Sequence, residues 1–219
     1  MKIAGQIHDF ATERDIEKWT LALQTANSIT INDNACYGVG HGHVLYDWFV
    51  EDCFSRIQTA INEPDMKLIF AMYLNETRPW NIHTDSYHTI GHKDKRTAYS
   101  LLIPLSVDND VNLADQSHTI VFNEHSDTYM PDNLSGKKWP WEDMTSTDHL
   151  SNSAAHIYQK HLSHNSYEKV NRFTIQGIYQ WKRGSLIWWN GTYFHDSDNF
   201  IANGYKSKQA IVIHCYYDC

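Results

Sequence analysis

Residues 181–200 read WKRGSLIWWNGTYFHDSDNF, and this stretch is the strongest guide to the fold. A turn, KRG, leads into the apolar run SLIWW at 185–189, and a second turn, NG, separates that run from a segment that contains His195. Short apolar runs bounded by glycine and asparagine are typical of β-strands joined by turns. The stretch therefore predicts a strand, a tight turn and a second extended segment that carries a histidine.

Similar short runs occur on both sides of this stretch. They are 67–74 (KLIFAMYL), 80–87 (WNIHTDSY), 97–105 (TAYSLLIPL), 119–122 (TIVF), 173–181 (FTIQGIYQW), 185–189 (SLIWW) and 209–217 (QAIVIHCYY). Turn residues separate most of these runs, and aromatic residues, which favour strands, make up 13% of the chain. We therefore expect a mainly β protein, an antiparallel sandwich or barrel rather than a doubly wound sheet.

The first 65 residues show a helical pattern instead. Thr12 and Asp15 resemble a capping box, which marks the start of a helix. The apolar residues that follow are spaced along one helix face: Ile16, Trp19 and Leu23. A second face of this kind recurs over 45–61. We expect one domain over 1–219, in which N-terminal α-helices at 1–65 pack on one sheet of a β core at 66–217.

A long polar interval at about 126–171 interrupts the β pattern. It contains Pro131, Gly136 and Pro140, many Ser, Asn and Asp residues, and one weakly helical patch at 154–162. A connection of this length inside a compact domain is usually functional or disordered. We therefore expect it to be a loop insertion in the β core.

Composition restricts the class of partner and the compartment. The chain has 18 Lys and Arg against 26 Asp and Glu, a formal net charge of −8, which disfavours binding to extended nucleic acid. No apolar h-region follows residues 1–10 and no apolar run reaches the length of a membrane span, so we expect neither a signal peptide nor a membrane-spanning helix. Its four cysteines form no C-x-x-C pair, so free thiols in a cytoplasmic protein are the expectation.

The candidate metal site begins with the motif H-x-D. Two imidazoles and one carboxylate form the facial triad of non-haem Fe(II) oxygenases, whose sequence form is H-x-[DE] followed by a distant histidine. The chain contains three H-x-D sequences: His83-Thr84-Asp85, His92-Lys93-Asp94 and His125-Ser126-Asp127. With 14 histidines, roughly one is expected by chance, so only context can decide between them.

Context favours His83 and Asp85. His92 and Asp94 lie in the charged turn GHKDKR, where a solvated surface is the default. His125 and Asp127 open the long polar interval. His83 and Asp85 instead lie in the strand-like WNIHTDSY, where two residues two apart point to the same face. We expect this pair to join His195 around one metal ion.

Both segments resemble motifs of the iron(II)/2-oxoglutarate-dependent oxygenase superfamily. SLIWW followed by His195 resembles the distal motif, G-[DS]-L-[ILV]-x-[FW] followed by a histidine, and HTDS resembles the proximal one. The resemblance implies a double-stranded β-helix, a jelly-roll or cupin-like barrel, with Fe(II) held by His83, Asp85 and His195. It also implies 2-oxoglutarate and O2 as cosubstrates, ascorbate as an optional reductant, and hydroxylation of a small-molecule or peptide substrate.

The resemblance extends to the last strand. Members of this superfamily carry an Arg or Lys at its start, which pairs with the far carboxylate of 2-oxoglutarate. Lys208 is the expected residue because K-x-A-I-x-I is similar to the family's strand pattern, and Lys206 is the rival. Tyr99 is expected either to donate a second hydrogen bond to the same ligand or to belong to the core. A lysine in place of arginine resembles the prolyl-hydroxylase-like branch, which implies a peptidyl or free amino acid, such as proline, as substrate.

Two alternatives remain open on the sequence. A cupin-like metalloenzyme would keep the barrel and the metal without 2-oxoglutarate, although the aspartate of H-x-D argues against the His- and Glu-rich ligand sets of cupins. A non-catalytic β-sandwich that binds carbohydrate through exposed Trp and Tyr side chains would bind no metal tightly.

Overall fold

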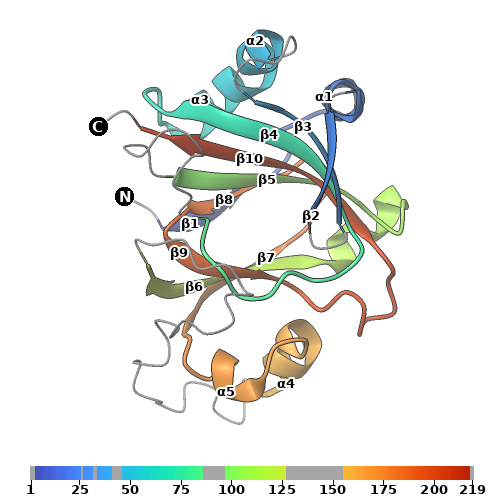
Figure 1. Ribbon diagram of the computed structural model, residues 1–219, viewed down its shortest axis with the longest axis vertical. Coiled ribbons are helices and arrows are strands. Elements are labelled where there is room, and N and C mark those ends of the chain that lie inside the picture. Colours follow the sequence, from blue (N-terminus) through green and yellow to red (C-terminus); the bar gives the residue numbers. More distant parts are fainter. Residues whose placement is uncertain are drawn as a thin grey trace.

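The computed structural model describes residues 3–25, 27–31, 34–40, 46–85, 97–126 and 155–217. For residues 27–31, 34–40, 46 and 97 it describes the backbone alone. Two antiparallel sheets lie face to face (Figure 1). The architecture is the mainly β double-stranded β-helix that the sequence predicted, with helices packed on the larger sheet.

The larger sheet has seven strands, all paired antiparallel, in the order β1-β8-β5-β10-β4-β3-β2. Their bounds are β1 Ala4–Ile7, β8 Leu186–Asn190, β5 Thr97–Val107, β10 Lys208–Tyr216, β4 Lys67–Glu76, β3 Asn34–Gly40 and β2 Asn27–Ile31. The smaller sheet has the order β7-β6-β9. Its strands are β7 Ile175–Gln180, β6 His118–His125 and β9 Tyr193–Ser197.

Helices cover the outer face of the larger sheet (Figure 1). They are α1 Glu13–Gln24, α2 Tyr46–Phe49 and α3 Ser55–Ile61, with a π-helical turn at Val50–Phe54 between the last two. The predicted face of α1 is buried, and so are its counterparts on the second helical segment: Ile16, Trp19 and Leu23, then Phe49, Cys53 and Ile57. The Trp19 indole donates a 2.6 Å hydrogen bond to Asp52, which ties the two segments together.

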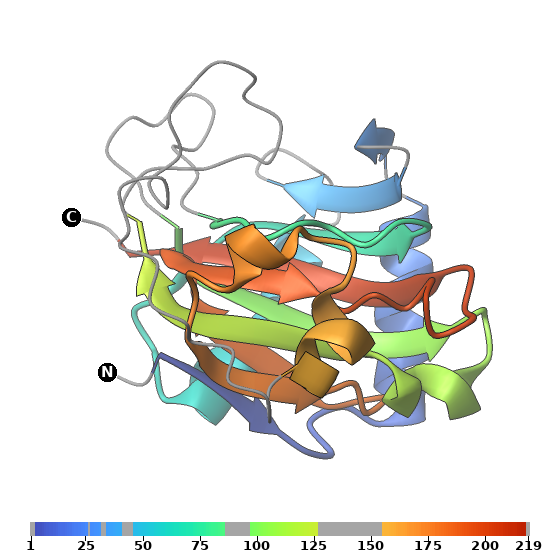
Figure 2. The same cartoon turned by 90° about the horizontal axis from the view of Figure 1, so that it is seen from below.

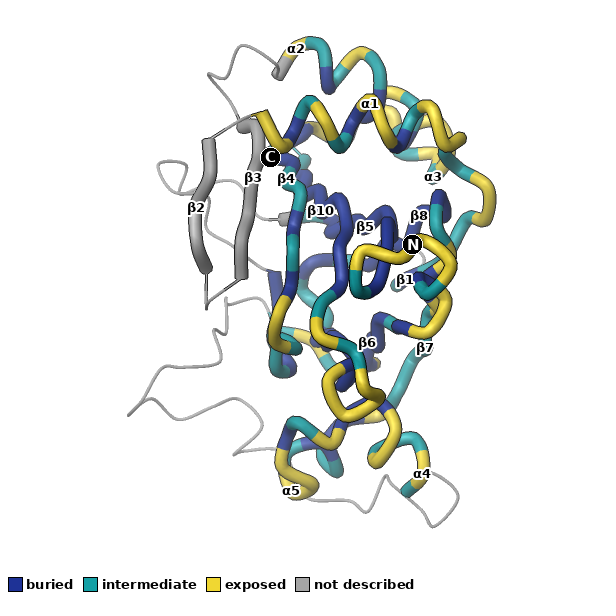
Figure 3. The backbone as a smooth tube through the Cα atoms, turned by 90° about the vertical axis from the view of Figure 1, so that its right-hand side faces the viewer, coloured by how far each residue is buried: buried dark blue, intermediate teal, exposed yellow. Residues whose placement is uncertain are grey.

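The central strand β10 has two different faces. Ile211 and Ile213 pack under the helices, whereas Ala210 and Val212 pack between the two sheets. This alternation runs through β10 without interruption, because the extra residues at its three register shifts lie in β4 and β5. The strands at the centre of the larger sheet are buried along most of their length, whereas α1 alternates between buried and exposed positions (Figure 3).

The helical expectation for residues 1–65 was incomplete, because three strands also lie there: β1, β2 and β3. β1 has only four residues, AGQI, and its partners, Leu186 to Trp189 on β8, are far away in the sequence. β3 reads NACYGVG and owes its place to pairing with β4. Strands this short or glycine-rich carry a weak local pattern, and distant pairing determines them.

Two other expectations need adjustment. The segment 80–87 is not a strand in its described part, which makes a single bridge at His83.

Within the predicted insertion, residues 127–154 lie outside the described residues, but the expected helical patch is present. It comprises α4 Ala155–Ile157 and a π-helical turn at Tyr158–Leu162, followed by α5 Tyr167–Val170, and it covers the smaller sheet (Figure 2). Within the described ranges, no helix is long and apolar enough to cross a membrane.

The capping box of α1 gives a stability prediction. The backbone N–H and hydroxyl of Thr12 both donate to Asp15, and Thr12 accepts from the Asp15 backbone N–H. Thr12→Ala removes two of these three bonds and lowers the free energy of unfolding by about 1 kcal/mol, measured by urea denaturation. Thr59→Ala, at an exposed position of α3, serves as the control and changes the free energy of unfolding by less than about 0.5 kcal/mol.

Candidate metal centre

The site begins with a backbone contact between two distant histidines. His83 follows β4 in an extended segment, and His195 lies in β9. The His83 N–H donates to the His195 carbonyl at 3.1 Å, and the His195 N–H donates back at 2.9 Å. Residues directly opposite in an antiparallel pair present their side chains on the same side, and the two imidazole rings are 4.2 Å apart, centroid to centroid.

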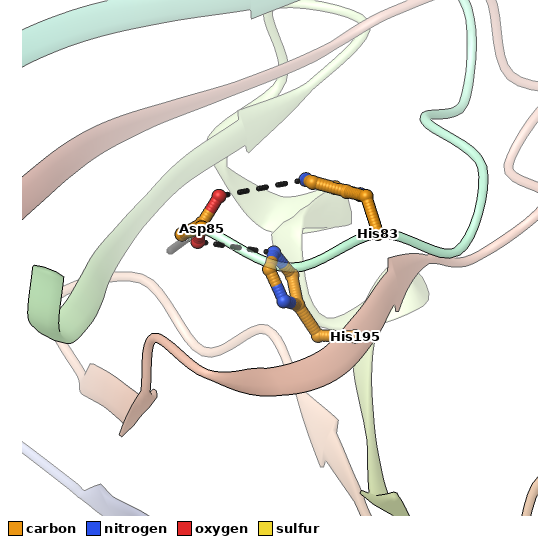
Figure 4. Close-up of side chains that lie close together, drawn as sticks. All are labelled: His83, Asp85 and His195. Atoms are coloured by element: carbon orange, nitrogen blue, oxygen red, sulfur yellow. Dashed lines mark ion pairs between the residues drawn. The ribbon is translucent and has the colours of Figure 1, made fainter. Parts of the chain in front are cut away.

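Asp85 completes the group. Its backbone N–H donates to the Gly191 carbonyl at 2.9 Å. This bond holds the segment of His83 and Asp85 at a second point, in addition to the bonds between His83 and His195. One carboxylate oxygen lies 3.6 Å from His83 Nε2 and the other lies 3.1 Å from His195 Nε2 (Figure 4). With metal–nitrogen distances of about 2.1 Å, ligands at right angles are about 3 Å apart. The three side chains therefore fit around one ion with little movement.

Both histidines direct Nε2, rather than Nδ1, toward the position of the metal. His83 Nδ1 lies 2.7 Å from the Asn81 carbonyl, and His195 Nδ1 lies 3.3 Å from the Tyr193 carbonyl. A carbonyl oxygen only accepts, so these contacts place a hydrogen on each Nδ1 and leave Nε2 directed at Asp85. Contacts of this kind orient metal-binding histidines in proteins generally.

Burial sets the protonation of the group. Burial and the nearby charge of His195 lower the pKa of His83 to about 4, so its Nε2 lone pair is free at neutral pH. Burial acts to raise the pKa of Asp85, but the charges of His195 and His214 lower it on balance. Burial acts to lower the pKa of His195, but the Asp85 carboxylate raises it on balance. A protonated His195 thus compensates Asp85, and a bound cation would take over that role.

Lys208 is the buried lysine that the sequence singled out. Only 1% of its surface is exposed, and it lies at the start of β10, on the face that carries Ala210 and Val212. Its ammonium lies 3.3 Å from Glu76 Oε2, 3.6 Å from Asp198 Oδ1 and 4.1 Å from the Trp181 ring centroid. Lys206, the rival, is exposed, and its backbone N–H donates to Asp108.

Tyr99 faces away from Lys208, so its expected role as a ligand of the cosubstrate is wrong. It lies on the outer face of β5, where its hydroxyl donates to Glu63 at 3.3 Å and its ring packs edge-on against Trp188. Its neighbour Ser100 points inward instead, where its hydroxyl lies 3.0 Å from His214. The alternation of the strand therefore places Tyr99 in the core, the second reading of the sequence.

Of the residues that define the other two H-x-D sequences, only His125 lies within the described part of the chain. His92, Asp94 and Asp127 lie outside the described residues. His125 is exposed at the end of β6, where its ring packs against Tyr193.

Several polar residues around Lys208 were not predicted from the sequence. Glu76 ends β4 and Asp198 follows β9, and the structure brings both carboxylates to the lysine. Asp198 also faces His118 and His161, so these three residues form a second cluster of ligand-type side chains. These residues are far apart in the sequence, so no short motif predicts that they meet. The nearest local indication is the sequence HDSD at 195–198, in which acidic residues follow the predicted metal ligand His195.

Comparison with known proteins shows the fold. No family model matches the chain, and no curated protein matches it. An oxidoreductase of the 2OG-Fe(II) oxygenase family from Burkholderia pseudomallei matches 98% of this chain and 84% of its own, with a TM-score of 0.54 and 6% identity. A prolyl-4-hydroxylase from Pseudomonas putida matches 99% and 93%, with a TM-score of 0.52 and 9% identity. The non-heme alpha ketoglutarate dependent epimerase SnoN from nogalamycin biosynthesis matches 99% and 78%, with a TM-score of 0.53 and 8% identity.

The position of Tyr99 can be tested directly. Tyr99→Phe removes the hydrogen bond to Glu63 and lowers the free energy of unfolding by about 1 kcal/mol, because the ring stays packed and one bond is lost. The Mn(II) affinity of the purified variant, measured by titration calorimetry, stays within about twofold of wild type. A large loss of Mn(II) or 2-oxoglutarate affinity with unchanged stability would contradict the outward placement.

Proposed function

We propose that the chain is a non-haem Fe(II) oxygenase that uses 2-oxoglutarate and O2, with the metal held by His83, Asp85 and His195. The observation that carries the proposal is the convergence of these three side chains inside a double-stranded β-helix. Two neutral imidazoles and one carboxylate are the ligand set of this enzyme class, and they leave several coordination positions for cosubstrates. The structural likeness to 2OG-Fe(II) oxygenases adds support for the fold alone.

The donor set and its surroundings fit Fe(II). Both Nε2 atoms and both carboxylate oxygens point toward one another, and Asp85 and His195 are nearly inaccessible to water. The Trp189 ring packs 4.7 Å from the His195 ring, centroid to centroid, and shields it. When bound, Fe(II) together with 2-oxoglutarate supplies the activation of O2 that oxidises a substrate C–H bond. The chain's part is to hold the ligands in place, exclude water and position the substrate.

Lys208 is the residue we assign to the far carboxylate of 2-oxoglutarate. In the structure its ammonium faces two carboxylates, Glu76 and Asp198, so a dicarboxylate has to compete for it. Burial raises the pKa of Glu76, although Lys208 opposes that shift. Glu76 therefore takes up a proton more readily than an exposed glutamate, and its neutral form leaves the ammonium available to the cosubstrate.

The substrate and the type of reaction form a separate part of the proposal. We favour hydroxylation of a peptidyl or free amino acid such as proline, because of the lysine in the last strand and the prolyl-4-hydroxylase among similar structures. The same fold also serves an epimerase, so the oxidation could end in a different product. Mass spectrometry of candidate peptides after reaction separates these outcomes, because hydroxylation adds one oxygen atom and epimerisation leaves the mass unchanged.

The central test is cosubstrate turnover. Purified protein with Fe(II), ascorbate and 2-oxoglutarate should form succinate even without substrate, and His195→Ala should abolish both succinate formation and Mn(II) binding. His125→Ala, an exposed histidine of another H-x-D sequence, is the matched control and keeps both. Metal binding without any binding or turnover of 2-oxoglutarate would favour the cupin-like alternative. Failure of the wild type to bind Mn(II) through His195 would favour the carbohydrate-binding module.

The two lysines provide a second test. Lys208→Met removes the ammonium but keeps an unbranched side chain, and it weakens 2-oxoglutarate binding about 10- to 100-fold, the value of one charge-assisted bond. Lys206→Met, in an exposed lysine two residues away, leaves the dissociation constant unchanged. Both are measured by calorimetry with Mn(II) in the absence of O2, after circular dichroism has shown that each variant is folded. Equal effects of the two substitutions would refute the assignment.

Glu76→Gln tests the competition for Lys208. The amide keeps the shape of the side chain and removes its charge, so 2-oxoglutarate binds as tightly as in wild type or more tightly. The same calorimetric titration measures this, and a weakening of more than tenfold would mean that Glu76 supports the cosubstrate rather than competing with it.

A further inference from the structure

A second cluster of ligand-type side chains lies beside the smaller sheet. His118 begins β6, His161 lies in the π-helical turn at Tyr158–Leu162, and Asp198 directly follows β9. Their ligand atoms all lie within 4.8 Å of one another. Backbone bonds hold these elements in register, because the Asp198 N–H donates to the His118 carbonyl at 3.2 Å and the Asn199 N–H donates to the His161 carbonyl at 2.7 Å.

The polar atoms at the centre of this cluster are buried and have no hydrogen-bond partner. They are His118 Nδ1, His161 Nδ1 and Asp198 Oδ2. Asp198 is completely buried and His161 is 5% exposed. His118 Nδ1 lies 3.5 Å from Asp198 Oδ2, which is too long for a strong hydrogen bond. Leaving such atoms without partners costs free energy, so three in one place indicate a missing ligand.

The orientation of Asp198 supports this view. Its Oδ1 accepts a 2.7 Å hydrogen bond from the Ser117 hydroxyl and lies 3.6 Å from the Lys208 ammonium. Its Oδ2 is thereby directed at His118. Lys208 and Ser117 lie on the Oδ1 side of the carboxylate, so Oδ2 is the oxygen left for a cation.

The two imidazole rings of the cluster are in contact with each other. The rings of His118 and His161 meet edge to face, 4.5 Å apart. An arrangement of two neutral imidazole nitrogens and one carboxylate oxygen is a common ligand set for Zn²⁺, and a tetrahedral ion leaves one further position for water.

We propose that His118, His161 and Asp198 form a second metal site, which binds Zn²⁺. This site is separate from the one formed by His83, Asp85 and His195. The site joins the helical segment 155–170 to β6 and to the end of β9, so the ion fastens this segment onto the smaller sheet. It requires no 2-oxoglutarate chemistry and stands whether or not the chain is an oxygenase.

The first experiment measures stoichiometry on the full chain. Protein stripped with a chelator is loaded with Zn²⁺, desalted and analysed by mass spectrometry for metal. Wild type holds two equivalents per chain, one in each group of ligands. The double variant His83→Ala/His195→Ala retains one, and in this background Zn²⁺ raises the Tm by about 5 °C or more. Failure of that double variant to retain Zn²⁺ would overturn the proposal.

Variants of the second site locate the ion. His161→Ala and Asp198→Asn, made in the His83→Ala/His195→Ala background, lose the remaining equivalent and the shift in Tm. His156→Ala in the same background is the matched control, since His156 is an exposed histidine of the same helical segment, and it retains both. Co²⁺ in place of Zn²⁺ gives a visible absorption band that disappears with His161→Ala. An unchanged metal content in His161→Ala would place the ion elsewhere and refute the site.

Discussion

The pair of backbone hydrogen bonds between His83 and His195 is the constraint on which the candidate centre depends. It joins a segment that follows the larger sheet to a strand of the smaller one, across more than a hundred residues of sequence. Because the residues are directly opposite, both imidazoles project to the same side, and Asp85 reaches them from two residues further on. The bond from the Asp85 N–H to Gly191 prevents this segment from rotating. Ligand geometry is therefore set by the main chain before any metal binds.

Much of this could be predicted from the sequence, wherever the information was local. The run SLIWW and the turn after it placed His195 in an extended segment, and the pattern K-x-A-I-x-I singled out Lys208 at the start of the last strand. The alternation of side chains along β5 does not show which of its faces is the inner one, because both are buried and largely apolar. Tyr99 was therefore open to two readings. The strands β1 and β3 were missed because their stability comes from distant partners rather than from their own composition.

The polar cluster around Lys208 could not have been predicted for a related reason. Glu76, Asp198 and His161 come from three elements far apart in the sequence, and each alone resembles a surface residue. Burial alters their role, because a charge removed from water needs a compensating charge nearby. Here the Lys208 ammonium lies close to two carboxylates. Asp198 in turn faces Lys208 with one oxygen and His118 with the other. The two halves of the polar interior are thus electrostatically connected through a single side chain.

The uninterrupted alternation of β10 has a consequence for the length of this strand. The three irregularities in its pairing are absorbed by extra residues in β4 and β5, so β10 itself keeps a regular alternation. A one-residue insertion or deletion in β10 would exchange its faces, moving Lys208 toward the helices and Ile211 into the polar interior. The number of residues in β10 is therefore constrained both by the packing of its apolar face and by the position of Lys208.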